Sequence, residues 1–285
     1  MEERIHFRIK NVANGPQIHY APTCYLRGHK LDDWQKFFLA ALTGGLVVKV
    51  LDIVYQEIRK RLDTRGSKKV FVDGHLEPLL KSADELVGKL RAHIESDFKE
   101  LDPLNGTEIN INNHEVGSTI YLFCRFWSQL EIVRTRGLTN TFADERRGKK
   151  LYNFIDCMES RRVRLLPRIV QRAIGESITE NDEPISFIDF CEKLNRDETL
   201  QMWIRPLVDV LNRTGHTTQR QSIMQYGVVI HAMIDDLDPK HRVTRKRPSW
   251  PNKLSRKSWR ALRYRVFKVY LRTVDFEGYI GPKKG

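Results

Sequence analysis

The residues of this chain that could do chemistry lie in two short runs of oppositely charged side chains. Glu131 and Arg134 are three residues apart and Trp127 lies one turn before them, so a helix would place an aromatic ring beside an ion pair. Arg172 and Glu176, four residues apart, form a second such pair. The favoured interpretation is an intrahelical ion pair in each helix, at the edge of a packed face. The alternative is a polar patch of these five residues that faces a ligand.

Sequence motifs for catalysis or metal binding are missing. The chain has no G-x-x-x-x-G-K-[ST], no G-x-G-x-x-G after a strand, no H-E-x-x-H and no G-x-S-x-G. Cys24, Cys124, Cys157 and Cys191 are scattered, with no CxxC pair and no histidine at ligand spacing. The sequence therefore favours binding over catalysis, and it names no catalytic residue, no metal and no cofactor.

The net charge of +13 resides entirely in the C-terminal segment 239–285, where 15 Lys and Arg residues stand against two acids. An apolar stripe through Trp259, Leu262, Val266, Val269 and Tyr270 predicts an amphipathic helix with basic flanks. Such a helix can lie on an anionic membrane leaflet or follow nucleic-acid phosphates, and the third interpretation is a helix of the body whose basic residues face solvent. The residues predicted to bind an anionic membrane or nucleic acid are Arg245, Lys246, Arg247, Lys257, Arg260, Arg263, Arg265, Lys268 and Arg272.

The segment 37–55 predicts a membrane anchor. It reads FFLAALTGGLVVKVLDIVY, with only Lys49 and Asp52 charged, and its length at about 1.5 Å per residue roughly matches a hydrocarbon core of about 30 Å. The alternative is a buried helix of a soluble bundle, because two charges within one span are costly. The residues expected to face lipid are Phe37, Leu39, Leu42, Val47, Val48, Val50 and Leu51.

Small residues in the same segment predict self-association. Ala40 with Gly44, and Ala41 with Gly45, are spaced by four residues, which lets two membrane helices approach closely. Lys and Arg are more numerous after the segment than before it, so its C-terminal side is expected in the cytoplasm. The sequence thus predicts a homo-oligomer in a bacterial inner membrane, with the main domain cytoplasmic.

Helices predominate in the rest of the chain. Alternating apolar and polar residues at 5–9 and 17–20, with a turn between them, predict a small N-terminal β-hairpin. Apolar residues that recur at three and four residues predict helices, with Pro78 at the start of the first and Gly137 at the end of the second. These helices are expected at 79–94, 118–136, 151–158, 166–177, 184–194, 200–211 and 220–237.

The predicted fold class is mainly α: a helical bundle with a small N-terminal β-hairpin and a long N-terminal hydrophobic helix. Apolar residues at 40% and charged residues at 30% are typical of a folded chain. The expected divisions are a hairpin at 1–30, a membrane-anchor helix at 31–65, a helical cytoplasmic domain at 66–238 and a basic amphipathic tail at 239–285.

Several segments, in this order, resemble a group of uncharacterised bacterial proteins. They are LAALTGGLVVKVLDIVYQEIRKR (39–61), LEPLLKSADELVGKL (76–90), STIYLFCRFWSQLEIVRTRG (118–137), and IVQRAIGES (169–177) with ISFIDFCEKL (185–194). The string QRAIGE is the most specific, and its Gly175 would let another helix pack close. The resemblance implies a single-pass anchor, a helical cytoplasmic domain and no assigned reaction. LLPR at 165–168 departs from the more aromatic pattern that precedes QRAIGE, and the tail is not covered.

These features predict a non-enzymatic, membrane-anchored protein that senses or recruits a partner and self-associates. Its expected partners are an anionic leaflet and a second copy of the chain, and the identity of a small-molecule ligand stays open. The alternative is a soluble nucleic-acid-binding protein that uses the basic tail. The third hypothesis is an enzyme of a class that the motifs do not reveal.

Overall fold

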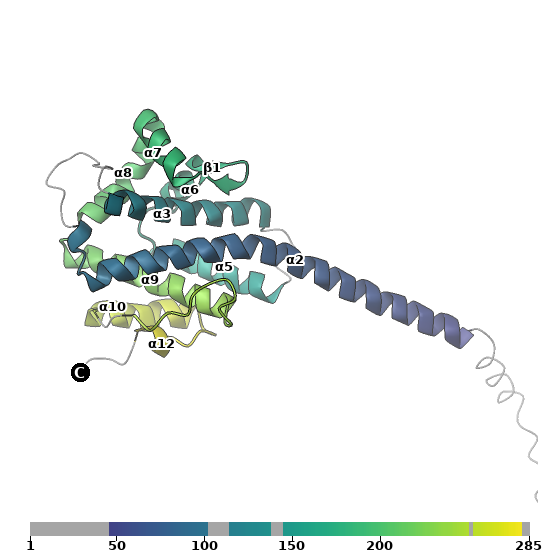
Figure 1. The fold of residues 1–285 in the computed structure, drawn as a ribbon. Coiled ribbons are helices and arrows are strands. Elements are labelled where there is room, and N and C mark those ends of the chain that lie inside the picture. Colours follow the sequence, from purple (N-terminus) through teal and green to yellow (C-terminus); the bar gives the residue numbers. More distant parts are fainter. Residues whose placement is uncertain (1–45, 102–113, 138–144, 251–252, 281–285) are drawn as a thin grey trace, which may run out of the picture. The chain divides into compact units, whose positions relative to one another are not determined.

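The protein is mainly helical, as the sequence predicts (Figure 1). The predicted hairpin at 1–30 and the first part of the predicted anchor helix, 31–45, lie outside the described residues and stay predictions. The computed structural model describes residues 46–101, 114–137, 145–250 and 253–280.

Contacts within the chain divide it into two compact units, residues 1–60 and 61–285. Helix α2 (Leu46–Glu95) contributes to both units, and it continues without a break through the predicted boundary between residues 65 and 66. From about Leu76 onward its apolar face is fully buried in the core of the second unit.

Pro78 lies inside α2 rather than at the start of a new helix. A proline in a helix interior removes a backbone hydrogen bond and costs about 3 kcal/mol. Leu76, Leu79 and Leu80 on either side of it are at most 1% exposed, and burying a leucine stabilises by about 1.5–3 kcal/mol. The predicted helix start at Pro78 is therefore wrong, because packing outweighs local propensity there.

Helix α3 (His114–Ile132) is the central helix of the second unit, and it ends in a π-helical turn, η2 (Val133–Gly137). The apolar spacing of the sequence predicts the buried face of α3 correctly, and Phe123 on this face is fully buried. α3 packs extensively on α6 (Arg168–Ser177). α2 lies along another side of α3, where His93 and Thr119 are joined by a hydrogen bond of 2.8 Å.

The remaining helices of the bundle surround α2 and α3 (Figure 1). α5 packs on α9, and α8 packs on both α6 and α7. The predicted helices over this region are confirmed, with ends that differ by a few residues. The bounds of these elements are η1 (Lys99–Leu101), α5 (Arg146–Glu159), α7 (Phe187–Arg196), α8 (Glu198–Asn212) and α9 (Thr217–Leu237).

The described residues contain one small antiparallel sheet, between α6 and α7, where the sequence predicted none. β1 (Thr179–Glu180) pairs with β2 (Glu183–Pro184). Asn181 and Asp182 form the turn with φ of 49° and 66°, a left-handed conformation that Asn and Asp tolerate better than other non-glycine residues. The helix expected from Pro184 therefore begins only at Phe187.

The C-terminal segment completes the core of the second unit. α10 and α12 pack on α9, and α11 packs on α5. Leu262, Val266 and Phe267 are at most 1% exposed. Of the predicted apolar stripe, Trp259, Leu262 and Val266 are therefore buried against the chain itself, as the third interpretation expects, while Val269 is 52% exposed. The elements are α10 (Arg256–Ala261), a π-helical η3 (Leu262–Phe267), α11 (Lys268–Tyr270) and α12 (Glu277–Ile280).

Residues 238–250 form a strap that is fastened to α2. Arg91 of α2 donates a hydrogen bond of 2.8 Å to the carbonyl oxygen of Pro248. Arg247 Nε lies 2.7 Å from Asp84 Oδ1, and its Nη2 donates to the Asp84 carbonyl oxygen at 2.8 Å. Arg247, which the sequence placed on an anion-binding surface, is therefore used within the fold.

Candidate functional site

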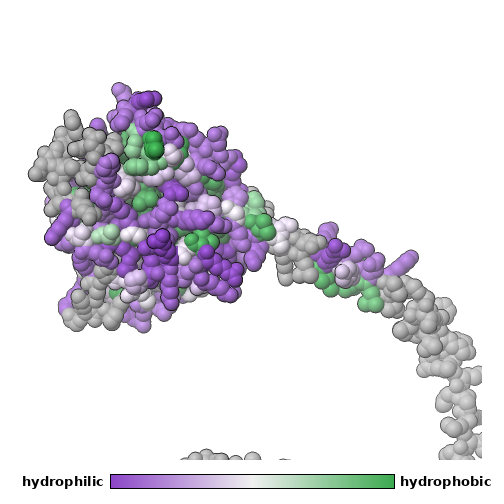
Figure 2. Space-filling model, in the orientation of Figure 1, coloured by the Kyte–Doolittle hydropathy of each residue, from purple (hydrophilic) through white to green (hydrophobic). Residues whose placement is uncertain are grey.

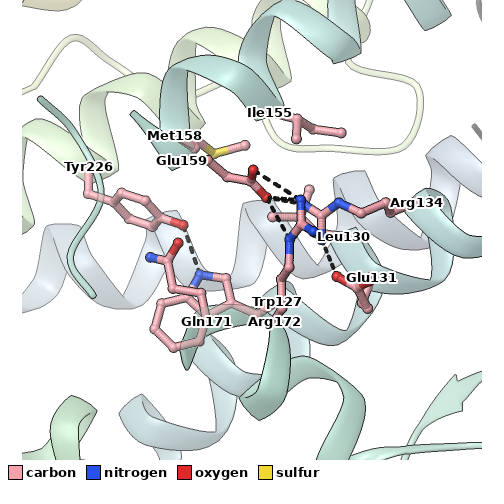
Figure 3. Close-up of a pocket in the computed structure, with 10 residues that line it drawn as sticks. All are labelled: Trp127, Leu130, Glu131, Arg134, Ile155, Met158, Glu159, Gln171, Arg172 and Tyr226. Atoms are coloured by element: carbon pink, nitrogen blue, oxygen red, sulfur yellow. Dashed lines mark hydrogen bonds and ion pairs between the residues drawn. The ribbon is translucent and has the colours of Figure 1, made fainter. Parts of the chain in front are cut away.

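Four of the five residues of the predicted polar patch line one small cavity (Figure 3). Trp127 and Glu131 belong to α3, Arg134 to the π-helical turn that follows, and Arg172 to α6. The close packing of α6 on α3 brings these residues together. The fifth residue, Glu176, lies apart: it is exposed and makes no ion pair within the described part of the chain.

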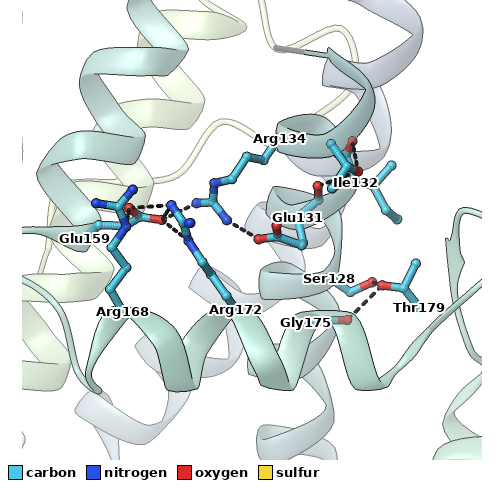
Figure 4. A network of polar contacts seen from close by, with 10 residues as sticks. Ser128, Glu131, Ile132, Arg134, Glu159, Arg168, Arg172, Gly175 and Thr179 are labelled. Carbon is cyan, nitrogen blue, oxygen red and sulfur yellow. Dashed lines mark hydrogen bonds and ion pairs between the residues drawn. The ribbon is translucent and has the colours of Figure 1, made fainter.

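Glu159, at the end of α5, is the centre of this site (Figure 4). Arg134, Arg168 and Arg172 all pair with its carboxylate, the last two at 2.5 and 3.3 Å. Arg134 also pairs with Glu131. Three guanidinium groups therefore share two carboxylates, whose side chains are only 8% exposed for Glu131 and 11% exposed for Glu159.

The inner end of the cavity is aromatic. Trp127 Nε1 donates a hydrogen bond of 2.8 Å to the hydroxyl oxygen of Tyr226. Burial raises the pKa of the Tyr226 hydroxyl, so this phenol stays neutral at physiological pH. Gln171 lines the same cavity, and its Nε2 has no acceptor among the described residues.

This arrangement holds helices together and does not admit a substrate. The cavity measures about 10 Å³, which is room for about one water molecule. A carboxylate that acts as a general acid or base must come within hydrogen-bonding reach of a substrate proton. Glu131 and Glu159 are instead engaged by arginines. The ion-pair interpretation is closer than the ligand patch: Glu131 and Arg134, three residues apart, do pair as predicted. Arg172, however, pairs with Glu159 of α5 and not with Glu176, so the network also joins α3, α5 and α6.

Gly175 of the QRAIGE segment permits the close approach of α6 to α3. A Cβ atom at this position would lie 2.7 Å from the carbonyl oxygen and 2.9 Å from the carbonyl carbon of Trp127. One turn along, Ser128 Oγ lies 2.7 Å from Thr179 Oγ1, which donates to the Gly175 carbonyl oxygen at 2.8 Å (Figure 4). The prediction that this glycine lets another helix pack close is confirmed.

The basic residues predicted for the C-terminal segment divide into two groups. Arg247 and Arg263 are used internally, and the Arg263 guanidinium lies 4.9 Å from the ring centres of both Trp259 and Phe276. Tyr264, which is 49% exposed, lies among the others. The others are exposed and make no ion pair within the described ranges: Arg245, Lys246, Lys257, Arg260, Arg265, Lys268 and Arg272.

A buried histidine, which the sequence did not single out, lies on α9. His231 is 2% exposed, and its ring stands edge-on to Trp250 and Tyr279 at centroid distances of 6.0 and 5.3 Å. Burial lowers the pKa of His231, while the Asp235 carboxylate, 3.6 Å away, opposes this shift. His231 is therefore neutral near pH 7. Among the residues that the structure describes, no group of His, Cys, Asp or Glu is arranged to hold a metal ion.

We expect the protein to lose stability as the pH falls from about 7 to about 5. Because the pKa of His231 is lower in the folded state than the value of about 6.5 for an exposed histidine, the unfolded state binds the proton first. The free energy of unfolding then falls by up to about 1.4 kcal/mol per pH unit. Urea unfolding at a series of pH values measures this slope. His231→Phe should reduce the slope and His216→Gln, at an exposed position, should not; equal slopes in the two variants would contradict the prediction.

The described part of the first unit carries apolar side chains that are exposed to solvent (Figure 2). Val50, Leu51, Val54 and Ile58 are 50, 62, 48 and 51% exposed, and their spacing places them on one side of α2. No helix within the described ranges is long and apolar enough to cross a bilayer. The other side chains predicted to face lipid, and the four Ala and Gly residues predicted for self-association, lie outside what the structure describes.

No family model, no curated protein and no solved structure matches this chain. The resemblance to a group of bacterial proteins with a membrane anchor therefore stays a prediction. What the chain does has to be inferred from the arrangement of its own residues.

Several residues of the arginine–glutamate site carry no local signal in the sequence. Glu159 is 25 residues from Arg134 and 13 residues from Arg172. Spacing rules find partners one turn apart on the same helix, and they cannot find partners on different helices. Glu159 directly follows the predicted helix 151–158, which is only a weak hint. The residues missed in this way are Glu159, Arg168, Gln171 and Tyr226.

Proposed function

We propose that this chain is a membrane-anchored binding protein: residues 37–55 lie in lipid, and the helical second unit recruits a partner beside the bilayer. The observation that carries this proposal is the apolar side of α2 between Val50 and Ile58, where four large side chains are about half exposed or more. Soluble proteins rarely leave a contiguous apolar stripe of this kind uncovered. The same side continues, in the sequence, into the apolar run that begins at Phe37.

The proposed orientation follows from charge. Lys and Arg are concentrated after residue 55, which favours an orientation with the second unit in the cytoplasm. The bacterial inner membrane follows from the resemblance to bacterial anchored proteins. Seven of the cations predicted for this role are exposed and make no ion pair within the described residues, and they suit the anionic cytoplasmic leaflet at about 1 kcal/mol per basic residue near the surface. Self-association through Ala40, Ala41, Gly44 and Gly45 remains part of this proposal.

A binding role is favoured over catalysis by the closed arginine–glutamate site. Its carboxylates are shielded by three arginines, and its cavity of about 10 Å³ excludes any substrate. Of the polar residues that the sequence offered for chemistry, Glu131, Arg134 and Arg172 are therefore engaged in joining α3, α5 and α6.

Fractionation of cells that express the full chain tests the anchor. We expect the protein to stay with membranes through washes with high salt and with alkaline carbonate, because lipid-embedded apolar residues are not released by charge screening. Leu51→Asp with Val54→Asp should move the protein to the supernatant. Ile188→Asp with Met202→Asp, at apolar positions that are 70 and 58% exposed in the second unit, should not. Release of the unaltered protein by carbonate would contradict the proposal.

The second candidate function is soluble nucleic-acid binding by the C-terminal segment. It is favoured by Tyr264, which is exposed and within 5.4 Å of the Arg263 guanidinium and 5.1 Å of Lys268 Nζ, so that an aromatic face lies among cations. Such faces stack on unpaired bases while the cations contact phosphates. In the same fractionation, release by salt or by nuclease treatment would favour this function over the anchor.

A further inference from the structure

A second cavity of the second unit, far larger than the arginine–glutamate site, measures about 590 Å³. It lies among α2, the start of α5, the end of α9 and the first residues of the strap. Volumes between about 300 and 1,000 Å³ are those of small-molecule sites. Its charged lining residues are Lys69, Asp73, Glu77, Arg146, Arg147, Lys150, Asp236, Asp238, Lys240 and Arg242.

Two carboxylates that line this cavity are neutralised by cations of α5. Arg147 pairs with Asp73 of α2, and its Nη2 donates at 2.7 Å to the carbonyl oxygen of Leu237 at the end of α9. Lys150 Nζ lies 2.5 Å from Asp236 Oδ1. Arg147 and Lys150 thus hold α2, α5 and α9 together, and their charges are neutralised by the carboxylates that they pair with.

The other two carboxylates are also engaged. Glu77 pairs with Lys81 at 2.7 Å, on the same helix. Asp238, which is 6% exposed, accepts hydrogen bonds of 3.0 to 3.1 Å from the backbone N–H groups of Arg242, Val243 and Thr244. These bonds fix the first turn of the strap and therefore the backbone of two of the cations that line the cavity.

Four cations are left over. Lys69, Arg146, Lys240 and Arg242 are exposed, and none of them makes an ion pair within the described residues. They come from three separate parts of the chain, namely α2, the first turn of α5 and the strap, and they line the same cavity. With the four carboxylates neutralised or capped, the cavity presents excess positive charge that would concentrate anions.

We propose that this cavity binds a small molecule that carries two or more phosphate groups. Phosphates are the anions that several cations spread around one cavity fit best, because each phosphate accepts from more than one donor and arginine can bind it bidentately. A concave site of this volume suits a compact ligand, whereas a polymer would need an open track. The proposal adds a ligand class to the partner-recruiting second unit, and it does not depend on the membrane anchor.

The test uses the full chain, purified in detergent, and inorganic triphosphate as the probe in isothermal titration calorimetry. We expect saturable binding at one site. Arg146→Gln, Lys240→Gln and Arg242→Gln together should weaken it about tenfold or more, because charge-assisted contacts to phosphate are lost. The matched control is Lys257→Gln, Arg260→Gln and Arg265→Gln, which removes the same charge from the C-terminal helices and should leave the affinity within about twofold.

Several outcomes would overturn the proposal. One is no binding of triphosphate at about 1 mM, and another is an equal loss of affinity in the two triple variants, which would indicate unspecific attraction by net charge. A third is that single-stranded RNA binds the unaltered protein but not the first triple variant, and that triphosphate does not compete with the RNA. Unfolding temperatures equal to that of the unaltered protein would exclude misfolding of the variants as the cause of weaker binding. Arg146→Gln alone should still weaken binding measurably.

Discussion

Gly175→Ala is expected to lower the free energy of unfolding by about 3 kcal/mol. The added methyl group would lie 2.7 Å from the carbonyl oxygen of Trp127 and 3.1 Å from the backbone nitrogen of Ser128. Both are main-chain atoms of a buried helix, so no flexible side chain can move aside. α6 must shift away from α3, which loosens the contact between these two helices.

Urea unfolding of the second unit's helices, followed by circular dichroism, measures this change. Gly74→Ala is the matched control, because nothing lies within 4 Å of a Cβ atom there and Gly74 also lies in a helix. Alanine is the better helix former, so this control should gain about 0.5–1 kcal/mol. A Gly175→Ala variant as stable as the unaltered protein would refute the close approach of α6 and α3.

Glu159→Gln should cost about 3 kcal/mol, since removing one partner of a buried ion pair leaves the other charge uncompensated. The amide keeps the shape of the side chain but withdraws the charge that Arg134, Arg168 and Arg172 share. Arg134 and Arg172 are 15 and 26% exposed, so water replaces the lost carboxylate poorly. α5 and α6 should therefore separate more readily at their junction.

Arg168→Gln is the control for this experiment. Arg168 pairs with the same carboxylate, but its side chain is 57% exposed, so the loss should stay below about 1 kcal/mol. The comparison separates the buried part of the network from its solvated edge. Equal, small losses in both variants would mean that the network adds little to stability.

Helix positions could be read from the sequence because the apolar spacing of each helix is a local property. α3, α8 and α9 appear where apolar residues recur at three and four residues. Pro78 misled this approach, because the local cost of a proline is visible in the sequence and the compensating burial of Leu76 and Leu79 is not. The turn at Asn181 and Asp182 was missed because strands of two residues have no detectable alternation.

The candidate site was predictable only in part, for a different reason. Trp127, Glu131 and Arg134 share one stretch of helix, so their spacing already indicated a common side. Glu159 joins them from another helix, and only the packing of α5, α6 and α3 brings it there. Long-range convergence of this kind has no signature in local spacing.

The basic composition of the C-terminal segment could not predict which of its cations are used within the fold. Charge alone could not separate Arg247, which is tied to Asp84, from Arg260 or Arg265, which face solvent. Lys253 is another cation used within the fold, since its Nζ donates at 2.6 Å to the Ile94 carbonyl oxygen near the end of α2. A basic run therefore serves both as an internal fastening and as a surface.

The burial of Leu262, Val266, Phe267 and Ile280 has a consequence for how this protein is made. On the ribosome, α2 and α3 emerge long before the residues that finish their bundle. Until then the nascent chain exposes apolar faces of α9 and α5, the kind of surface that chaperones bind. A premature stop codon after α9 would thus remove part of the buried core, and not merely the positively charged end.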